Sequence, residues 1–222
     1  MVTLGAMEKI SVDIWSDIIC LWCPIGKKQF DAALAAFPHR DSVVVRHHSF
    51  QLDPAMPQLS STPLFERAAQ DMGTTPANAA RVLGQVAAIA ARVGLEYRLE
   101  SVKVANSFDA HRLVHLATDH GRTEEVRGRL MRAFTTEGAV ISDRDTLVRL
   151  AEEAGLDPQE AAAVLDGDKY ADAVRADQEL AHRLGVTGVP TYIVDGSYIT
   201  SGSKDPEELS RMLDQALRKK NA

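Results

Sequence analysis

The stretch that decides the fold is residues 16–26, which read S-D-I-I-C-L-W-C-P-I-G and place two cysteines three positions apart. Before it, residues 10–15 (I-S-V-D-I-W) alternate apolar and polar side chains, the period of a half-buried strand. After it, apolar side chains in residues 26–37 recur at helical spacing until Pro38. The Cys-x-x-Cys pair therefore falls between a strand and a helix.

Strand character returns in residues 42–52, which begin with a run of valines and end before Asp53-Pro54. A strand, a helix and a second strand at these lengths predict a parallel pair joined by a crossover helix.

The next 120 or so residues, from Thr62 to Gly185, carry almost no strand signal and are punctuated by glycines typical of left-handed helix ends. Those glycines are Gly73, Gly94, Gly121, Gly138, Gly155, Gly167 and Gly185. Helix starts are predicted at Thr75-Pro76 and, as a proline-bearing capping box with Glu160, at Asp157-Pro158. One apolar helix stripe is formed by Val82, Val86, Ile89 and Val93. This block predicts a small helical domain.

The last part returns to strands, at residues 191–194 and 198–201, with Asp195-Gly196 as the hairpin turn between them. Asp205 begins a final helix, and its buried side is predicted to consist of Leu209, Met212, Leu213 and Leu217. The predicted order is strand, helix and strand, then the helical block, then helix, strand, strand and helix.

The two cysteines point to redox chemistry, because a Cys-x-x-Cys pair at a helix start closes a disulfide with little strain. Unpaired N–H groups and the helix dipole favour a negative charge there. We therefore expect Cys20 to be the attacking thiolate and Cys23, one turn into the helix, to resolve the mixed disulfide.

Two other interpretations of the cysteines stay open at this point. A zinc site would need further ligands, but the chain has only two cysteines. His111 and His115 are four apart on one helix face, although they lack the glutamate of an H-E-x-x-H motif, so packing or surface roles are favoured. The second interpretation is a pair of inert buried thiols, which the position at a helix start disfavours.

Composition narrows the function classes. The formal net charge is −6 and basic residues are scattered, which argues against a nucleic-acid partner. No apolar run is long enough for a membrane span, and residues 1–7 lack the pattern of a secretory signal. We therefore expect a cytoplasmic protein with no membrane partner, in a compartment where a purely structural disulfide is unusual.

Pro190 is the second notable feature, since it comes directly before the strand at 191–194. A proline at the first residue of a strand is permitted in the ordinary trans form. A cis proline here would instead expose the Val189 backbone beside the sulfurs, and local sequence alone favours trans.

Residues 16–27, the segment N-S-F-D-A-H-R-L at 106–113 and residues 185–191 together resemble the DsbA family. More narrowly they resemble its cytoplasmic FrnE-like branch, which is related to 2-hydroxychromene-2-carboxylate isomerases and kappa-class glutathione transferases. The three segments fall in the family's order, and the resemblance extends from about Ile10 to Leu217.

The resemblance implies an α/β thioredoxin-like fold with an inserted α-helical domain. We place the first thioredoxin-like part at 1–58, the helical insertion at 59–168 and the second thioredoxin-like part at 169–222. It also implies that Pro190 is cis and faces Cys20 and Cys23. Substrate binding is assigned to Val189, Pro190, Trp22 and Asn106, although Asn106 could equally be a helix cap or turn residue. No metal site is expected.

The chain departs from the branch pattern between and after the cysteines. Relatives commonly carry proline after the first cysteine and an aromatic residue after the second, whereas this chain has Leu21 and Pro24. Because the dipeptide between the cysteines tunes thiolate stability, the family's usual reduction potential does not transfer to this chain.

Three functions follow as hypotheses. The leading one is a thiol–disulfide oxidoreductase or isomerase that exchanges disulfides with protein or small-molecule thiols through Cys20 and Cys23. It needs no cofactor beyond that redox-active pair, and glutathione is a candidate co-substrate. The second is a glutathione-dependent isomerase or transferase, and the third is a non-catalytic, chaperone-like binding protein. Either a monomer or a homodimer fits the sequence.

Overall fold

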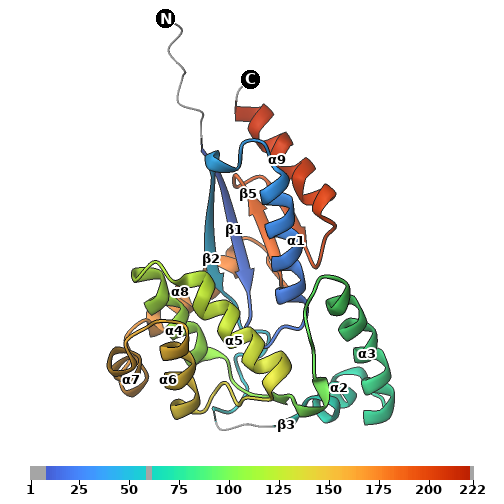
Figure 1. Ribbon diagram of the computed structural model, residues 1–222, viewed down its shortest axis with the longest axis vertical. Helices are drawn as coiled ribbons and strands as arrows, with labels where there is room; N and C mark the ends of the chain where they lie inside the picture. The colour runs from blue at the N-terminus through green and yellow to red at the C-terminus, as the bar shows by residue number, and fades with distance from the viewer. Residues whose placement is uncertain (1–8, 59–61, 221–222) are drawn as a thin grey trace, which may run out of the picture.

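The computed structural model of the protein describes residues 9–58 and 62–220. Figure 1 shows a sheet with flanking helices in the upper part and a group of helices below it. The upper part contains β1 (Ile10–Ser16), α1 (Trp22–Ala36), η1 (Arg40–Ser42), β2 (Val43–Ser49), β5 (Thr191–Val194), β6 (Tyr198–Ser201) and α9 (Pro206–Lys220). The α/β fold with a helical insertion is confirmed.

The remaining elements make up the lower part. They are β3 (Thr62–Pro63), α2 (Leu64–Met72), α3 (Pro76–Arg92), η2 (Leu99–Ser101), β4 (Lys103–Val104), α4 (Phe108–Asp119), α5 (Thr123–Glu137), α6 (Arg144–Glu153), α7 (Pro158–Asp166) and α8 (Ala171–Arg183). α2 and α3 lie on one side of this group, and α4 to α7 lie on the other (Figure 1).

The main sheet has the strand order β2-β1-β5-β6. β1 and β2 are parallel, as the strand–helix–strand pattern predicts, whereas β5 pairs antiparallel with both β1 and β6. In the β5–β6 hairpin, Asp195 has a φ of 52° and Gly196 a φ of 66°, so both predicted turn residues are left-handed.

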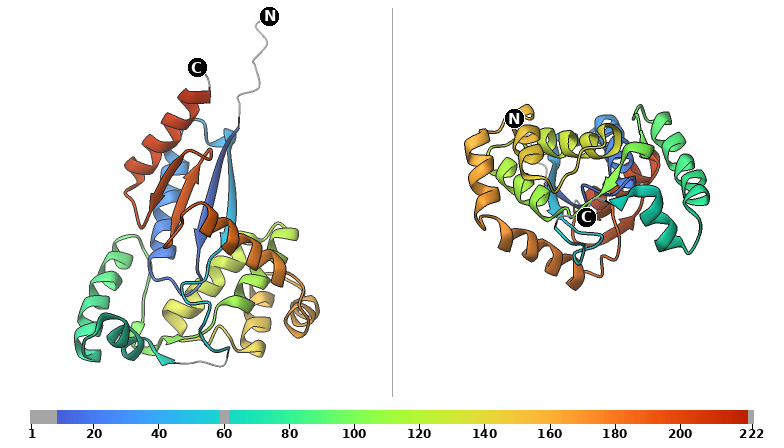
Figure 2. Two further views of the ribbon diagram at one scale, coloured as in Figure 1. Left: turned by 180° about the vertical axis from the view of Figure 1, so that it is seen from behind. Right: turned by 90° about the horizontal axis from the view of Figure 1, so that it is seen from below.

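The two faces of the sheet are covered by different helices. Ile14 pairs across the sheet with Tyr192, and both belong to the apolar cluster formed with α1 and α9. Trp15 and Ile193 belong to another cluster, which includes Ala181 of α8. Figure 2 shows α9 and α8 on different sides of the strands, so the sheet is sandwiched between helices.

The helical part has its own apolar cluster, and both cysteines of the redox pair belong to it. The inserted helices therefore pack directly against the start of α1. The boundaries predicted at 58/59 and 168/169 stay a prediction, and residues 59–61 lie outside the described ranges. Residues 1–8 also lie outside the described ranges, and the expectation of no secretory signal rested on them.

Several local predictions in the helical part are confirmed. Thr75 caps α3 by accepting from the backbone N–H of Asn78, and Asp157 caps α7 by accepting from Gln159 and Glu160. The Glu160 side chain does not return to the cap, however, because it contacts His120 at 2.8 Å. Only half of the predicted capping box forms.

Other predictions for this part are wrong. Gly167 follows α7 with φ −111° and ψ −154°, so it is extended and not left-handed. Val82 is 37% exposed, because the buried side of α3 follows Ala79, Val86 and Ala90 instead. The short β3–β4 pair was missed, since two-residue strands leave no periodic signal.

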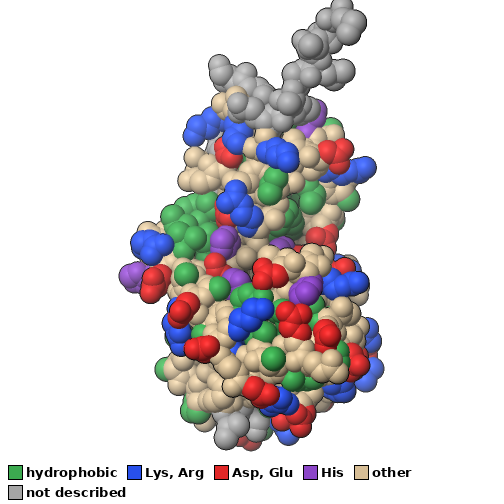
Figure 3. All heavy atoms as spheres, turned by 90° about the vertical axis from the view of Figure 1, so that its left-hand side faces the viewer, with side chains coloured by type: hydrophobic (Ala, Val, Ile, Leu, Met, Phe, Trp, Pro, Cys, Tyr) green, Lys and Arg blue, Asp and Glu red, His purple; other side chains and the backbone are tan. Residues whose placement is uncertain are grey.

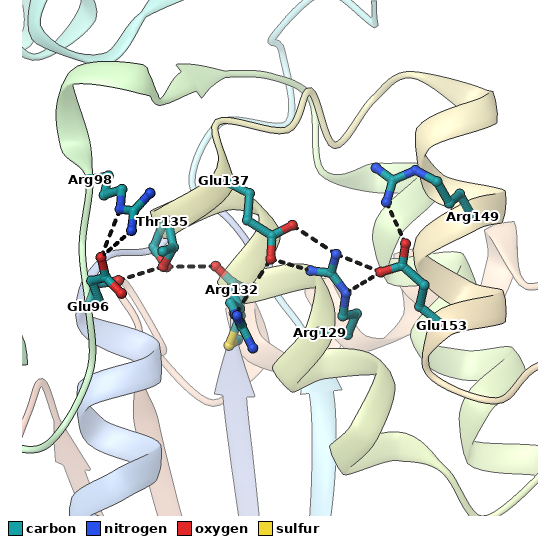
Figure 4. Close-up of polar contacts among 10 residues, drawn as sticks. Glu96, Arg98, Arg129, Arg132, Thr135, Glu137, Arg149 and Glu153 are labelled. Carbon is teal, nitrogen blue, oxygen red and sulfur yellow. Dashed lines mark hydrogen bonds and ion pairs between the residues drawn. The ribbon is translucent and has the colours of Figure 1, made fainter.

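Helices α5 and α6 are joined at the surface by alternating charges (Figure 4). Arg129 contacts both Glu137 and Glu153, at 2.8 and 2.6 Å, and Arg149 also reaches Glu153 at 2.5 Å. Isolated surface ion pairs contribute little to the free energy of folding. A network of shared ion pairs can hold the ends of two helices, here α5 and α6, in register. In the described residues, no helix has the length and apolarity that crossing a membrane requires.

A second polar cluster fastens α8 to the sheet. His48 on β2 contacts Asp177 of α8 at 2.7 Å and Asp13 of β1 at 3.0 Å, and its ring stacks on Trp15. Burial opposes the charged form of His48, but the hydrogen bonds to Asp177 and Asp13 outweigh it and raise the pKa of His48. On the face drawn in Figure 3, several histidines lie across the middle of the molecule among acidic and basic side chains.

This cluster predicts a pH-dependent stability. Because the folded pKa of His48 lies above 6.5, its contribution is fully present below pH 6.5 and is lost as the pH rises through the folded value. We therefore expect the free energy of unfolding to fall over that interval, and His48→Gln to remove that part of the fall. Urea unfolding at a series of pH values measures it.

The matched control is His182→Gln, which changes an exposed histidine on α8. It should leave the pH dependence of the wild type in place. An unchanged pH dependence in His48→Gln would show that the cluster does not stabilise the fold through protonation.

Candidate active site

The two cysteines lie at the junction between β1 and α1. Cys20 ends a turn in which its N–H donates to the Asp17 carbonyl at 3.3 Å, and the N–H of Cys23 donates to the Cys20 carbonyl at 3.2 Å. Leu21 is the residue before α1, and no side chain caps this helix end. The predicted position of the pair at a helix start is confirmed, although α1 begins at Trp22, earlier than the sequence pattern indicates.

The turn before β5 lies against the first cysteine. The Val189–Pro190 peptide bond is cis, as the family resemblance implied. Cys20 Sγ donates a hydrogen bond to the Val189 carbonyl oxygen at 3.4 Å, although 169 positions separate the two residues. The Pro190 carbonyl in turn accepts from the N–H of Gly202 at 2.7 Å, which fixes the turn to the strand beyond.

Gly26 makes this close approach sterically feasible. A Cβ atom at Gly26 would lie 2.6 Å from the Tyr192 hydroxyl and 2.9 Å from Pro190 Cγ. Both separations are shorter than ordinary contacts between such atoms. The first turns of α1 can therefore touch the proline turn only with glycine at this position.

Both thiols are free and buried: Cys20 is 4% exposed and Cys23 is 2% exposed. Burial raises the pKa of Cys23 well above its ordinary value, and a hydrogen bond with Cys20 and the charge of Cys20 raise it further. Burial also raises the pKa values of Tyr97 and Tyr192, and the charges of the two cysteines act in the same direction. The site therefore favours one negative charge on the sulfur pair over two.

Tyr97 reaches the site from the inserted helical part. Its hydroxyl donates a hydrogen bond to the Leu21 carbonyl at 2.6 Å. This bond fixes the backbone of the dipeptide that separates the two cysteines. Sequence reasoning missed Tyr97, because nothing in its neighbourhood marks it and 76 positions separate it from Leu21.

A buried carboxylate lies directly before the cysteines. Asp17 is fully buried and contacts His111 Nε2 of α4 at 3.2 Å. His115, one turn further along α4, contacts Asp177 at 3.1 Å and Ser49 at 3.2 Å. The two histidines thus serve different acidic partners, and within residues 9–58 and 62–220 no group of three or more metal-ligating side chains converges.

These features identify a fold family. A family model described as a DSBA-like thioredoxin domain matches residues 11–214. The chain belongs to this family.

Known proteins support that membership. A probable DsbA oxidoreductase from Streptomyces coelicolor superimposes with a TM-score of 0.90, at 41% identity, over 93% of this chain and 89% of that one. The uncharacterized protein YwbO of Bacillus subtilis is 28% identical over 95% of this chain and 99% of its own length. The cytosolic disulfide reductase DsbM from Pseudomonas aeruginosa has a TM-score of 0.64 at 21% identity, over 94% and 98%, and shows likeness of fold.

The remaining sequence-assigned residues of this DSBA-like chain lie in different places. Trp22 is 37% exposed and lines an open cavity of about 740 Å³ with Lys28 and Arg92. Asn106 is buried, and its amide accepts from Gln51 and from the N–H of Phe108. Those bonds match the turn role left open for Asn106, and its role in substrate binding stays a prediction.

A second cavity reaches the cysteine pair from the side of α5. It has a volume of about 380 Å³ and is lined by Cys23, Pro190 and Tyr192 together with apolar residues of the sheet and α1. Charged side chains of α1 and α5 surround it, and Lys27 contacts Glu124 at 2.7 Å. The cavity is large enough for a small molecule beside Cys23.

Gly26→Ala tests the close approach of α1 to the proline turn. The added methyl group has to displace Pro190 or Tyr192, so we expect the free energy of unfolding to fall by about 1–3 kcal/mol. Thiol–disulfide exchange should slow as well, because the Val189 carbonyl moves away from Cys20. Chemical denaturation and an exchange assay measure the two effects.

Gly128→Ala in α5 is the matched control, because a Cβ atom there meets nothing within 4 Å. It should be neutral or raise stability by up to about 1 kcal/mol. Equal stability of the Gly26→Ala and Gly128→Ala variants would contradict the steric argument.

Proposed function

We propose that this DSBA-like chain is a thiol–disulfide oxidoreductase in which Cys20 attacks and Cys23 resolves. The observation that carries the proposal is the pair of free thiols at the start of α1, with Cys20 Sγ bonded to the carbonyl of Val189. This arrangement puts a nucleophilic sulfur beside the backbone of the bend that precedes β5, where a substrate backbone can pair.

The order of the two roles follows from their surroundings. Cys20 precedes the helix, where a negative charge on sulfur interacts favourably with the helix N-terminus. Cys23 lies inside the first turn, and burial keeps it protonated by raising its pKa. The thiol at the helix end attacks, and Cys23, which burial keeps protonated, then displaces the substrate.

The reaction balances without a further cofactor. The Cys20 thiolate attacks one sulfur of a substrate disulfide, which forms a mixed disulfide and releases the other substrate sulfur as a thiolate. Cys23 loses its proton, attacks Cys20 Sγ and releases the second substrate thiol. Two cysteine thiols are oxidised to one disulfide while the substrate disulfide is reduced to two thiols, and the reverse sequence oxidises a dithiol.

Small-molecule thiols are reasonable substrates alongside proteins. The cavity beside Cys23 and Pro190 has the size of a small-molecule site. Val189 and Trp22 lie outside its lining and stay proposed substrate contacts. The Pseudomonas DsbM has been crystallised with glutathione. Glutathione is therefore the co-substrate we propose, in a cytoplasmic enzyme like that reductase. Either a monomer or a homodimer satisfies this scheme.

Cysteine substitutions test the proposal. Cys20→Ser should abolish insulin reduction and the reduction of oxidised glutathione, because it removes the attacking sulfur. Cys23→Ser should instead accumulate a mixed disulfide on Cys20, visible as a mass increase in intact-protein mass spectrometry. Iodoacetamide at neutral pH should label Cys20 before Cys23 in the reduced wild type.

The two alternative functions make different predictions in the same assays. A glutathione-dependent isomerase would keep its activity in Cys23→Ser, and a chaperone-like protein would suppress aggregation even with both cysteines replaced by serine. Wild-type protein that reduces neither insulin nor oxidised glutathione would overturn the proposed oxidoreductase.

A further inference from the structure

Two cavities lie beside the sulfur pair, on different faces of α1. The cavity of about 380 Å³, which we call the α5-side cavity, is lined from α1 by Cys23, Lys27, Phe30, Asp31 and Leu34. The cavity of about 740 Å³ is lined from α1 by Trp22, Lys28, Gln29 and Ala32. At helical spacing the first set falls on one face of α1 and the second set on the opposite face. Among the described residues, the two linings have no member in common.

The α5-side cavity reaches one sulfur of the pair and not the other. Cys23 belongs to its lining, whereas Cys20 does not, and Cys20 Sγ is bonded instead to the Val189 carbonyl at 3.4 Å. In the oxidised pair, a molecule in this cavity therefore meets the Cys23 end of the disulfide. An attacking thiolate has to approach a disulfide sulfur from the side opposite the sulfur that leaves. The cavity is thus placed for attack on Cys23 with Cys20 as the leaving sulfur.

The stability of the leaving thiolate favours the same direction. Attack on Cys23 releases Cys20, which precedes α1, so that its negative charge interacts favourably with the helix N-terminus. Attack on Cys20 would release Cys23, where burial opposes a negative charge and raises the pKa of the thiol. Because a disulfide is cleaved faster when the more stable thiolate leaves, attack from the α5-side cavity has the better leaving group.

The charged part of the lining determines which kind of thiol fits. Lys27 contacts Asp31 and Glu124, both at 2.7 Å. Arg127 contacts Glu124 at 3.0 Å. Burial and the charge of Arg127 lower the pKa of His47, which keeps this histidine uncharged near neutral pH. A thiol that carries a carboxylate would have to displace an acidic side chain from its cation, whereas a thiol without net charge would not.

The rest of the lining is mostly apolar and restricts the size of the occupant. Its apolar side chains come from the sheet and from α1, and they are Ile14, Phe30, Leu34, Val45 and Tyr192. A volume of about 380 Å³ is at the lower end of the range for small-molecule sites. The cavity therefore fits a short thiol with an uncharged or apolar body.

We propose that a low-molecular-weight thiol without net charge enters the α5-side cavity and reduces the oxidised Cys20–Cys23 pair by attacking Cys23. The inference rests on the proposed oxidoreductase function, and it supplies the step that regenerates the dithiol after a substrate disulfide has been reduced. Substrate exchange at Cys20 and regeneration at Cys23 then take place from different sides of the sulfur pair.

The step balances with two molecules of thiol. The first, as a thiolate, attacks Cys23 Sγ, the bond between Cys23 and Cys20 breaks, and Cys20 leaves as a thiolate. A second thiolate attacks the small-molecule sulfur of the mixed disulfide and releases Cys23. Two small thiols are oxidised to one disulfide while the protein disulfide is reduced to two cysteine thiols. The protons of the small thiols pass to the cysteines through solvent.

The first test locates the attacked sulfur. Oxidised wild-type protein is mixed with 2-mercaptoethanol, quenched with acid within the first turnover and digested with pepsin at low pH, where protonated thiols exchange slowly. Fragment-ion mass spectrometry then assigns the 2-mercaptoethanol adduct to Cys20 or to Cys23. We expect the earliest adduct mainly on Cys23, and an adduct mainly on Cys20 would overturn the inference.

The second test changes the volume of the cavity. Val45→Phe places a ring in the lining, so we expect reduction of the oxidised protein by 2-mercaptoethanol to slow at least about tenfold. Leu34→Ala widens the cavity and should speed the same reaction, and it carries the test if Val45→Phe does not fold. Glutathione, which is larger and bears two carboxylates, is the comparison reductant, and Val45→Phe should slow it much less.

Val44→Phe is the matched control, because neighbouring residues of a strand point to opposite faces and Val44 is 37% exposed. It should be reduced at the wild-type rate by both reductants. The inference is overturned if 2-mercaptoethanol reduces Val45→Phe and Leu34→Ala at the wild-type rate, or if Val45→Phe slows glutathione as strongly as 2-mercaptoethanol. Wild-type protein that reduces neither insulin nor oxidised glutathione would instead refute the proposed oxidoreductase.

Discussion

The contact on which the rest of the structure depends is the one between Gly26 of α1 and the ring of Pro190 before β5. It brings together two segments that the whole helical insertion separates in the chain. Once they touch, the Val189 carbonyl lies within reach of Cys20, and the first turn of α1 is covered on one side by the sheet. The insertion covers the other side, since both cysteines share its apolar cluster.

Burial from both sides determines the chemistry of the pair. A sulfur that loses its proton in such a place needs compensation from a helix end or from hydrogen bonds. Cys20 precedes α1, whereas Cys23 lies in its first turn. The surroundings of Cys20 and Cys23 therefore differ, although only three positions separate them. The inserted helices also contribute polar groups to this environment, namely the Tyr97 hydroxyl and the His111 imidazole.

The sequence predicted what depends on local periodicity and on a short motif: the strand–helix–strand start, the hairpin at Asp195-Gly196 and the cysteine pair at a helix start. It misjudged places where tertiary packing decides. Val82 fits a helical stripe but faces outward, because the neighbours of α3 cover a different side of the helix. Tyr97, the long-range partner of the site, was equally invisible, since it belongs to no pattern that repeats along the chain.

His111 shows how a sequence pattern leaves the partner of a side chain open. Its spacing from His115 raised a metal site, because two histidines on one helix face are compatible with one ion. In the fold the two rings diverge: one lies beside the carboxylate before the cysteines, and the other reaches the cluster that fastens α8 to the sheet. The sequence shows the chemistry of a side chain. Its partner depends on which helices and strands pack next to each other in the fold. The insertion thus does more than cover the thioredoxin-like part, because it completes the polar environment of the two buried thiols.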